Sequence, residues 1–204
     1  MIGIVNYGSG NVDAVANIYK RLNIDYEITG DTAVLERSSH LILPGVGAFD
    51  ETMRILYDTG LKSFLDIMVL QKQKLVMGIC IGMQLLAEGS EEGELEGFGW
   101  IKGKVKRLDS SKLQLKPHLP HLGWNTVEQK YEHPIFKNID QNKGFYFLHS
   151  FYYDCSRPED VLGTTDYGIN FASAVRRDNI FGMQFHPEKS HDNGVSLFRN
   201  FSTL

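Results

Sequence analysis

Short apolar runs alternate with helical patterns through the first half of the chain. The runs Ile2–Asn6, Tyr26–Thr29, His40–Leu43 and Leu75–Ile79 are of strand length and are bounded by polar or turn-forming residues. Between them, apolar residues recur at intervals of three and four, which is typical of an amphipathic helix. These helical segments are Val12–Leu22, Asp50–Gln73 with a break at Gly60, and Ile81–Glu88.

The second half is richer in strands than in helices. The predicted strands are Trp100–Leu108, Gly123–Glu128, Gly144–Tyr153, Val161–Thr165, Phe171–Arg177 and Ile180–His186, and a last helix covers Gly194–Phe201. The turn Arg177-Asp178-Asn179 predicts a hairpin between the last two strands. The whole chain, residues 1–204, is therefore predicted to form one α/β domain. Its central sheet is expected to be mixed but mostly parallel, with helices on both faces and the functional edge at the strand ends.

Composition and charge exclude several classes of function. The chain has 204 residues and a formal net charge of -4, and its lysines and arginines form no stripe that could bind nucleic acid. No apolar run approaches the ~20 residues of a membrane span. Met1–Val5 lacks the features of a signal peptide. The two cysteines lack zinc-site spacing, so we expect a reducing compartment, the cytoplasm.

One of the two cysteines lies in a sequence typical of a nucleophile. Cys80 is flanked by Gly78 and Gly82, between a predicted strand and a predicted helix. A sharp turn of this kind exposes the nucleophile, and the start of the helix lowers the thiol pKa and offers backbone N–H groups to an oxyanion. An isolated cysteine is more often a small buried residue, but the two glycines favour the catalytic role. Cys155 lacks such a context and is interpreted as structural.

A thiol nucleophile needs a base and a residue that orients it. His186 and Glu188 stand two positions apart around Pro187, which would hold His186 extended so that both side chains face one site. The acid follows the histidine, whereas an α/β-hydrolase places it before. Four other histidines have no such neighbour and are interpreted as solvated or as hydrogen-bonded within the fold: His40, His118, His133 and His191.

The histidines also raise the question of a metal site. The spacing from His186 to His191 crosses a proline and matches no usual zinc site. The sequence therefore predicts neither a metal nor a cofactor.

Five blocks carry a resemblance to a known family. The segments Gly78–Gln84 and Phe185–Glu188 resemble the class I, or triad, glutamine amidotransferases, whose domain has a flavodoxin-like fold. The segments Pro44–Gly47, Pro120–Asn125 and His149–Phe151 are similar to those of the glutaminase subunits of imidazole glycerol phosphate synthase. The resemblance extends from Asn6 to about Phe201.

The resemblance implies a role for each matched residue. Cys80 would attack the side-chain amide of L-glutamine to form a glutamyl thioester, His186 would relay protons, and Glu188 would orient the imidazole. Glutamine would contact Gly47, Gln84, Glu92, Ser150 and Phe151. The turn Pro44–Gly47, with Gly45 and Val46, would supply an oxyanion N–H after a peptide reorients.

The resemblance also implies a partner. Ammonia would pass into a (β/α)8-barrel cyclase subunit that docks over the active site, and the positions that match this docking face are Asn11, Trp124 and Lys189. A core tryptophan and a solvated lysine are the alternative interpretation of the last two. An aromatic ring beside a lysine suits a cation–π contact.

Three functional alternatives stay open at this point. The segment from Gly168 to His191 is also similar to paralogues that supply ammonia for sugar amidination in surface-polysaccharide synthesis. A glutaminase-like module that has lost catalysis would carry an altered Cys80, His186 or Glu188, and all three are present. A stand-alone γ-glutamyl hydrolase would not need the partner-facing motif at Gly123-Trp124.

Overall fold

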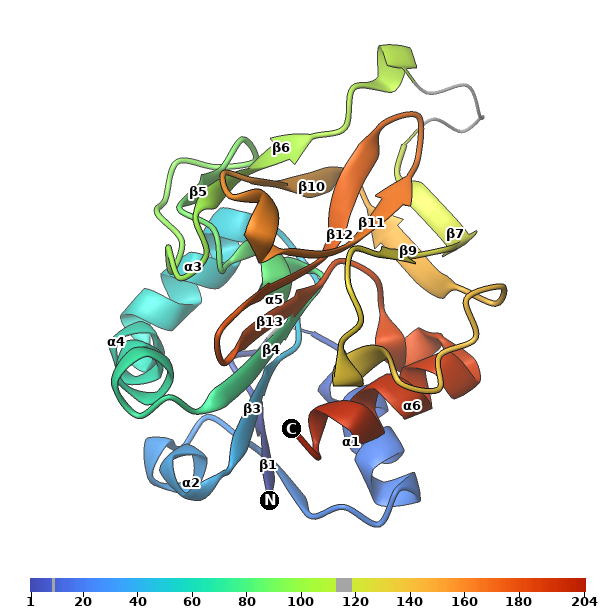
Figure 1. The fold of residues 1–204 in the computed structure, drawn as a ribbon. Helices are drawn as coiled ribbons and strands as arrows, with labels where there is room; N and C mark the ends of the chain where they lie inside the picture. Colours follow the sequence, from blue (N-terminus) through green and yellow to red (C-terminus); the bar gives the residue numbers. More distant parts are fainter. Residues whose placement is uncertain (9, 113–118) are drawn as a thin grey trace.

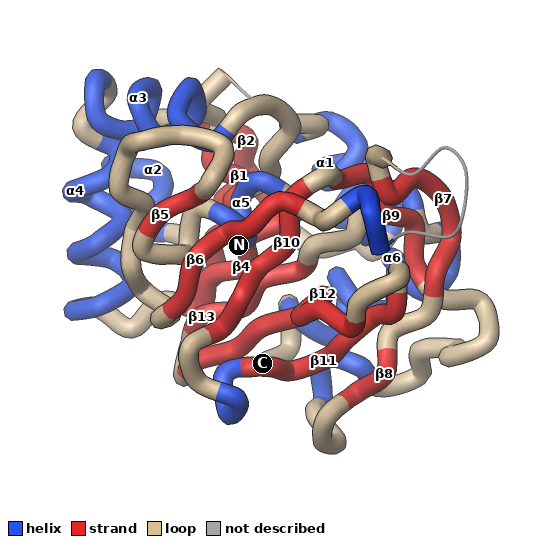
Figure 2. The backbone as a smooth tube through the Cα atoms, turned by 90° about the horizontal axis from the view of Figure 1, so that it is seen from above, coloured by secondary structure: helices blue, strands red, loops and turns tan. Residues whose placement is uncertain are grey.

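The computed structural model describes residues 1–8, 10–112 and 119–204. Its main sheet runs in the order β2-β1-β3-β4-β13-β12-β10-β6-β5, with β11 beside β12 and β8 beside β11, and a separate small sheet pairs β7 with β9 (Figures 1 and 2). The strands are β1 Ile2–Val5, β2 Tyr26–Thr29, β3 His40–Leu43, β4 Leu75–Ile79, β5 Gly89–Ser90, β6 Gly103–Arg107, β7 His121–Asn125, β8 Glu128–Gln129, β9 Phe145–His149, β10 Phe151–Cys155, β11 Val161–Asp166, β12 Asn170–Arg177 and β13 Ile180–Met183.

The helices lie between the strands, except α6, which follows the last strand. They are α1 Val12–Arg21, α2 Thr32–Arg37, α3 Phe49–Asp58, α4 Leu61–Asp66, the π-helix η1 Ile67–Gln71, α5 Ile81–Gln84 and α6 His191–Phe201. Short 3-10 turns are η2 Ser110–Lys112, η3 Pro134–Phe136, η4 Pro158–Asp160 and η5 Pro187–Lys189. Among the described residues no helix is both long and apolar enough to cross a lipid bilayer.

The five strands β2-β1-β3-β4-β13 pair in parallel, in the order of a flavodoxin-like sheet. From β13 outward the pairing of β12, β10 and β6 is antiparallel. This arrangement confirms the predicted mixed α/β sheet. The central strands are buried on both faces, as parallel strands flanked by helices must be.

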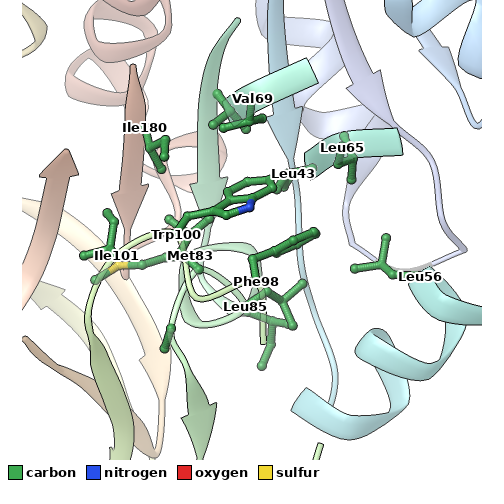
Figure 3. Packing of buried hydrophobic residues seen from close by; sticks show 14 of the residues in the cluster. Leu43, Leu56, Leu65, Val69, Met83, Leu85, Phe98, Trp100, Ile101 and Ile180 are labelled. Carbon is green, nitrogen blue, oxygen red and sulfur yellow. The ribbon is translucent and has the colours of Figure 1, made fainter. Parts of the chain in front are cut away.

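Two apolar clusters lie on opposite faces of the sheet. Along β3, Leu41 and Leu43 belong to the cluster under α3 and α4, whereas Ile42 belongs to the cluster under α1 and α6. Figure 3 shows the first cluster, where Phe98 and Trp100 stack with ring centroids 4.0 Å apart. The alternation along each strand therefore anchors the sheet to helices on both sides.

The predicted helix Ile81–Glu88 is wrong in its length, since α5 ends at Gln84. The next three carbonyl groups accept hydrogen bonds from a loop instead of from a following helical turn. Phe98 N donates to Leu85 O at 2.7 Å, Ile101 N to Leu86 O at 3.2 Å and Gly99 N to Ala87 O at 2.9 Å. Tertiary pairing thus overrides helix propensity here.

The predicted strand Gly144–Tyr153 is in fact two strands, separated at Ser150. Strand β9 pairs with β7 in the small sheet, and β10 pairs with β6 in the main sheet. Because the two halves have different neighbours, the chain changes sheets at Ser150. The break leaves this residue in a cavity wall, as described below.

Other boundaries differ by smaller amounts. Strand β6 begins at Gly103 rather than Trp100, and β13 ends at Met183 rather than His186. The predicted strand Gly123–Glu128 is divided between β7, which begins at His121, and β8. Helix α6 begins at His191 rather than Gly194.

Helix α6 supplies a direct test of the packing. Leu197 is fully buried against the sheet, so Leu197→Ala is expected to lower the free energy of unfolding by ~2–5 kcal/mol through lost burial and a residual cavity. The exposed neighbour Arg199→Ala should change it by less than ~0.5 kcal/mol. Urea denaturation measures both values, and equal losses in the two variants would contradict this packing.

Candidate active site

Cys80 lies on a sharp turn between β4 and α5. Its backbone has φ 53° and ψ -110°, a conformation that L residues rarely adopt outside functional turns. The turn is held by backbone hydrogen bonds from Cys80 N to Met183 O at 2.7 Å and from Gln84 N to Cys80 O at 3.1 Å. The predicted strand-to-helix elbow is therefore confirmed.

The flanking glycines are required by close backbone approach. A side chain on Gly82 would collide with the carbonyl oxygen of Leu43, and one on Gly78 would collide with the carbonyl oxygen of Gly82. Gly45, in the turn after β3, packs in the same way against Gly82 N. The elbow and the Pro44–Gly47 turn are thus in direct backbone contact.

His186 and Glu188 form the predicted pair, but by a different local geometry. His186 Nδ1 lies 2.8 Å from Glu188 Oε1, and both side chains are almost completely buried. The chain is extended at His186, as Pro187 requires, and then turns into η5. The expectation that extended backbone would align the two side chains is therefore wrong, because the 3-10 turn brings them together.

The electrostatic surroundings of His186 favour a proton carrier. Burial alone lowers the pKa of an imidazole, but the Cys80 thiol and the Glu188 carboxylate more than offset it and raise the His186 pKa to about 10. His186 Nε2, the nitrogen not held by Glu188, is buried and makes no hydrogen bond of normal geometry within the described residues. That nitrogen is left to exchange a proton with a thiol or a bound molecule.

Cys80 and His186 share one cavity of about 230 Å³. Its volume is below the ~300–1,000 Å³ of drug-sized pockets, which suits a ligand of amino-acid size. The wall includes all five residues predicted to contact glutamine: Gly47, Gln84, Glu92, Ser150 and Phe151. Val46 also lines the cavity, and Gly45 lies behind it against the elbow.

Two of these wall residues also hold the structure around the cavity. Glu92 Oε2 accepts a hydrogen bond of 2.9 Å from Phe49 N, at the start of α3 just after the Pro44–Gly47 turn. Gln84 Nε2 donates to Phe151 O at 3.3 Å, while Gln84 Oε1 is buried and has no hydrogen-bond partner among the described residues. An unpaired buried amide oxygen is available to a donor group on a bound molecule.

Sequence reasoning missed several residues around the thiol. Gln184 Nε2 lies 3.8 Å from Cys80 Sγ, which is itself 3.8 Å from the carbonyl oxygen of Leu148. Gln184 is fully buried. The signal that could have found it is a single polar residue inside the apolar run Ile180–Phe185.

A pair of buried histidines adjoins the cavity and was also missed. His121 Nδ1 lies 2.9 Å from His149 Nε2, and His149 lines the cavity wall. Burial lowers the pKa of His121 to about 4. Burial, together with the neighbouring His121, lowers that of His149 to about 3. Both rings are therefore neutral at physiological pH.

Of the residues predicted to face a partner, Trp124 lies on the exposed face of β7 and Lys189 lies in the cavity wall. Trp124 is 47% exposed, which excludes the alternative of a core tryptophan. Lys189 lines the cavity and places Nζ 5.9 Å from the centre of the Tyr146 ring. The lysine is thus beside Tyr146, whereas Trp124 stacks on His191 at a centroid distance of 5.2 Å.

Asn11 lies at the start of α1. Its side chain accepts a hydrogen bond of 3.3 Å from Ala14 N and so caps α1. It also lines a second depression of about 490 Å³ that shares Val46 with the first. Asn11 and the cavity are therefore neighbours across Val46.

His40, His133 and Cys155 are not part of the cavity wall. His40 contacts Ser39 Oγ at 2.9 Å, and His133 Nδ1 accepts from Ile135 N at 3.1 Å. His118 lies outside the described residues. Burial and nearby carboxylates raise the pKa of Cys155 to about 12, which keeps this thiol protonated and unreactive.

Comparison with known proteins identifies the family. The model of the class-I glutamine amidotransferases matches residues 4–203. The chain belongs to this family. Among relatives of this amidotransferase, "Imidazole glycerol phosphate synthase subunit HisH" of Leptospira interrogans is 47% identical over 204 residues, and that of Leptospira borgpetersenii is 44% identical over 204 residues. Each alignment covers 100% of both chains.

A solved structure agrees on the fold. The "Crystal structure of glutamine amidotransferase" superimposes with a TM-score of 0.74 at 18% identity, covering 100% of this chain and 99% of the other. Glutamine amidotransferases of low sequence identity thus share the arrangement of strands and helices found here.

The neutral histidine pair of this amidotransferase predicts a loss of stability in acid. Because the folded-state pKa values of His121 and His149 lie below the usual ~6.5, their contribution is complete above about pH 6.5 and is lost as the pH falls toward 4. The free energy of unfolding should fall by up to ~1.4 kcal/mol per pH unit for each ring in this range.

Urea denaturation between pH 7 and pH 4.5 measures that slope. The variant His121→Phe keeps an aromatic ring but cannot be protonated, so its slope should be shallower than that of the native chain. Identical slopes in the two proteins would contradict a neutral buried pair.

Proposed function

We propose that this chain is the glutaminase subunit of an imidazole glycerol phosphate synthase and that it hydrolyses L-glutamine to glutamate and ammonia. The observation that carries the proposal is that Cys80 and His186 line one small cavity, with His186 held by Glu188 at 2.8 Å. The full-length similarity to the HisH subunits supports the choice of substrate.

The chemistry begins at the thiol. Cys80 transfers its proton to His186, and the sulfur attacks the side-chain amide carbon of glutamine to form a tetrahedral intermediate. The intermediate collapses as His186 gives the proton to the leaving nitrogen, which departs as ammonia and leaves a glutamyl thioester. His186 then takes a proton from water, and the resulting hydroxide attacks the thioester to release glutamate and restore the thiol. Glu188 fixes the imidazole and stabilises its charged form.

The remaining residues bind the substrate and its oxyanion. Glu92 and Gln84 offer carboxylate and amide oxygens to the α-amino end of glutamine, and Ser150 and Phe151 offer backbone groups of the same cavity wall. The turn with Gly45, Val46 and Gly47 supplies an N–H to the oxyanion once a peptide has reoriented. Gly47, with φ 132°, has the backbone freedom for this movement.

A partner subunit takes up the ammonia. Val46, Leu122 and Trp124 are exposed apolar side chains at 51%, 59% and 47%, and Lys189 stands at the cavity edge. Together with Asn11 they suit a docking face for a (β/α)8-barrel cyclase, which would enclose the mouth and prevent ammonia from being protonated and diluted. We place the chain in the cytoplasm with this partner. Supply of ammonia to surface-sugar amidination is not favoured, because the relatives that match over the full length are named as imidazole glycerol phosphate synthase subunits.

Removal of the thiol tests the division of labour. Cys80→Ala should abolish glutamine hydrolysis by the complex, because no nucleophile remains, while the cyclase keeps its turnover with ammonium salt. Glutamate release and product formation are measured with glutamine and then with ammonium chloride. Cys155→Ala is the matched control and should retain glutamine use.

Loss of both activities in the Cys80→Ala complex would contradict the proposed division. High glutaminase activity of the native chain alone, unchanged by the partner, would favour a stand-alone hydrolase. An inactive native complex that still assembles would favour a binding module.

The docking face makes a separate prediction. Trp124→Ala removes a large exposed ring from this face and should weaken the affinity for the cyclase subunit by ~30-fold or more, the range of an interface hot spot. Tyr131 is 39% exposed outside this face, and Tyr131→Ala should bind normally. Titration calorimetry measures both, and equal affinities would contradict the assigned face.

A further inference from the structure

A buried chain of hydrogen bonds begins on the inner side of β7. Asn125 Nδ2 lies 3.3 Å from His121 Nε2, His121 Nδ1 lies 2.9 Å from His149 Nε2, and His149 Nδ1 lies 2.7 Å from Phe151 O. His121 is 3% exposed and His149 is 6% exposed. Neither residue is needed for the chemical steps proposed above.

The Phe151 carbonyl, where this series of hydrogen bonds ends, fixes the position of each proton along it. The carbonyl oxygen of Phe151 can only accept, so His149 carries its proton on Nδ1 and presents Nε2 as an acceptor. His121 must then donate through Nδ1, which leaves its Nε2 to accept from the Asn125 amide. The other N–H of the Asn125 amide donates a hydrogen bond of 2.9 Å to Asp166 O. Both rings are neutral in this arrangement, and every polar atom along it has a partner.

The carbonyl oxygen of Phe151 also connects this series of hydrogen bonds to the Cys80 thiol. Phe151 O also accepts from Gln84 Nε2, whose second proton goes to Gln184 Oε1 at 3.0 Å. Gln184 Nε2 in turn lies 3.8 Å from Cys80 Sγ. Hydrogen bonds therefore run without a break from β7 to the thiol, across the wall of the glutamine cavity.

Packing holds the His121 ring in place. It stacks on Phe147 at a centroid distance of 4.6 Å and on Tyr167 at 4.0 Å, with 19° between the planes in each case. A ring clamped between two aromatic faces can shift only with the strand that carries it. A movement of β7 is thus passed to His149.

Strand β7 has two faces with different neighbours. Leu122 and Trp124 point outward and are exposed, whereas His121 points inward to His149. Successive side chains of a strand lie on opposite faces, so a molecule bound to the outer pair presses on the strand that carries His121. Within the described residues, β7 and β9 pair with each other and with no strand of the main sheet (Figure 2), although Asn125 Nδ2 donates to Asp166 O of β11 and Tyr146 O accepts from His186 N.

We propose that His121 and His149 are positioning residues that couple docking of the cyclase on β7 to the glutamine cavity by fixing the carbonyl oxygen of Phe151. This inference rests on the proposed function, since it requires a partner on the outer face of β7. It assigns the histidine pair a role in the response to the partner and none in proton transfer to the substrate.

The test is the ratio of glutaminase kcat/KM with the cyclase subunit to that without it. His121→Phe keeps the aromatic stack but leaves His149 Nε2 without a donor, and it should lower this ratio about tenfold, the effect of one lost buried hydrogen bond. His121→Asn restores a donor near the position of Nδ1 and should recover most of the ratio. A purely structural role would lower both rates together and leave the ratio unchanged.

His40→Phe is the matched control. His40 is half-buried at the first position of β3, and the Pro44–Gly47 turn follows the other end of this strand. Its replacement should therefore leave the ratio at the native value. Native-like ratios in both His121 variants, or an equal loss in His121→Phe and His121→Asn, would overturn the inference. If the native chain itself showed no response to the cyclase, the proposed function would fail, and that result is distinct from a native response that His121→Phe preserves.

A measurement on the native chain covers the case in which His121→Phe does not fold. Nitrogen-15 NMR of the labelled imidazoles reports which ring nitrogen carries the proton. His149 and His121 should both be protonated on Nδ1 and not on Nε2. A proton on His149 Nε2 would overturn the inference, because the hydrogen bond to Phe151 O would then be absent.

Discussion

The parallel pairing of β3, β4 and β13 is the constraint on which the rest of the site depends. Leu43 is in register with Gly78, and Gly78 is in register with Gly182. The three strands therefore end together, so that the Pro44–Gly47 turn, the Cys80 elbow and the segment leading to His186 emerge at one edge of the sheet. A shift of one residue in β13 would move its side chains to the opposite face and separate the histidine from the thiol.

This constraint explains the small residues at the edge. Strands that end side by side bring their turns into backbone contact, and the elbow helix has room beside Leu43 only because Gly82 has no side chain. The Pro44 turn is held from beneath by Tyr7, whose buried hydroxyl donates to Pro44 O. Burial raises the pKa of Tyr7, so this hydroxyl keeps its proton. The hydrogen bond from Tyr7 fixes the Pro44 carbonyl, and Gly47 has φ 132°. A peptide of this turn that reorients is therefore expected at Gly47 or next to it.

Local signals predicted the parallel half of the fold and the triad. The apolar runs that became β1, β2, β3 and β4 have the bounds of the observed strands to within one residue. Strands β1, β3 and β4 are buried on both faces, and β2 is a partly buried edge strand. The Cys80 elbow could be predicted because Gly78 and Gly82 each stand only two positions from Cys80 in the sequence. The link between His186 and Glu188 was visible for the same reason, although its 3-10 geometry was not.

Non-local pairing accounts for what sequence reasoning missed. Nothing local to Ser150 indicates that β9 and β10 belong to different sheets, since that depends on β7 and β6. Likewise, His121 and His149 are 28 residues apart, and their pairing follows from the register of β7 with β9. The aromatic neighbour of Lys189 is non-local for the same reason, because Tyr146 belongs to β9 and lies 43 positions earlier in the chain.

The central claim is that Cys80 is the nucleophile, with His186 as its proton carrier. The most direct measurement is mass spectrometry of the complex mixed with glutamine and quenched before one turnover is complete. The account predicts a glutamyl group on the peptide that contains Cys80, and a longer lifetime of this thioester when the mixing is done at lower pH, where His186 activates water less well. Acylation of Cys155, or glutamate release without any acylated cysteine, would contradict it.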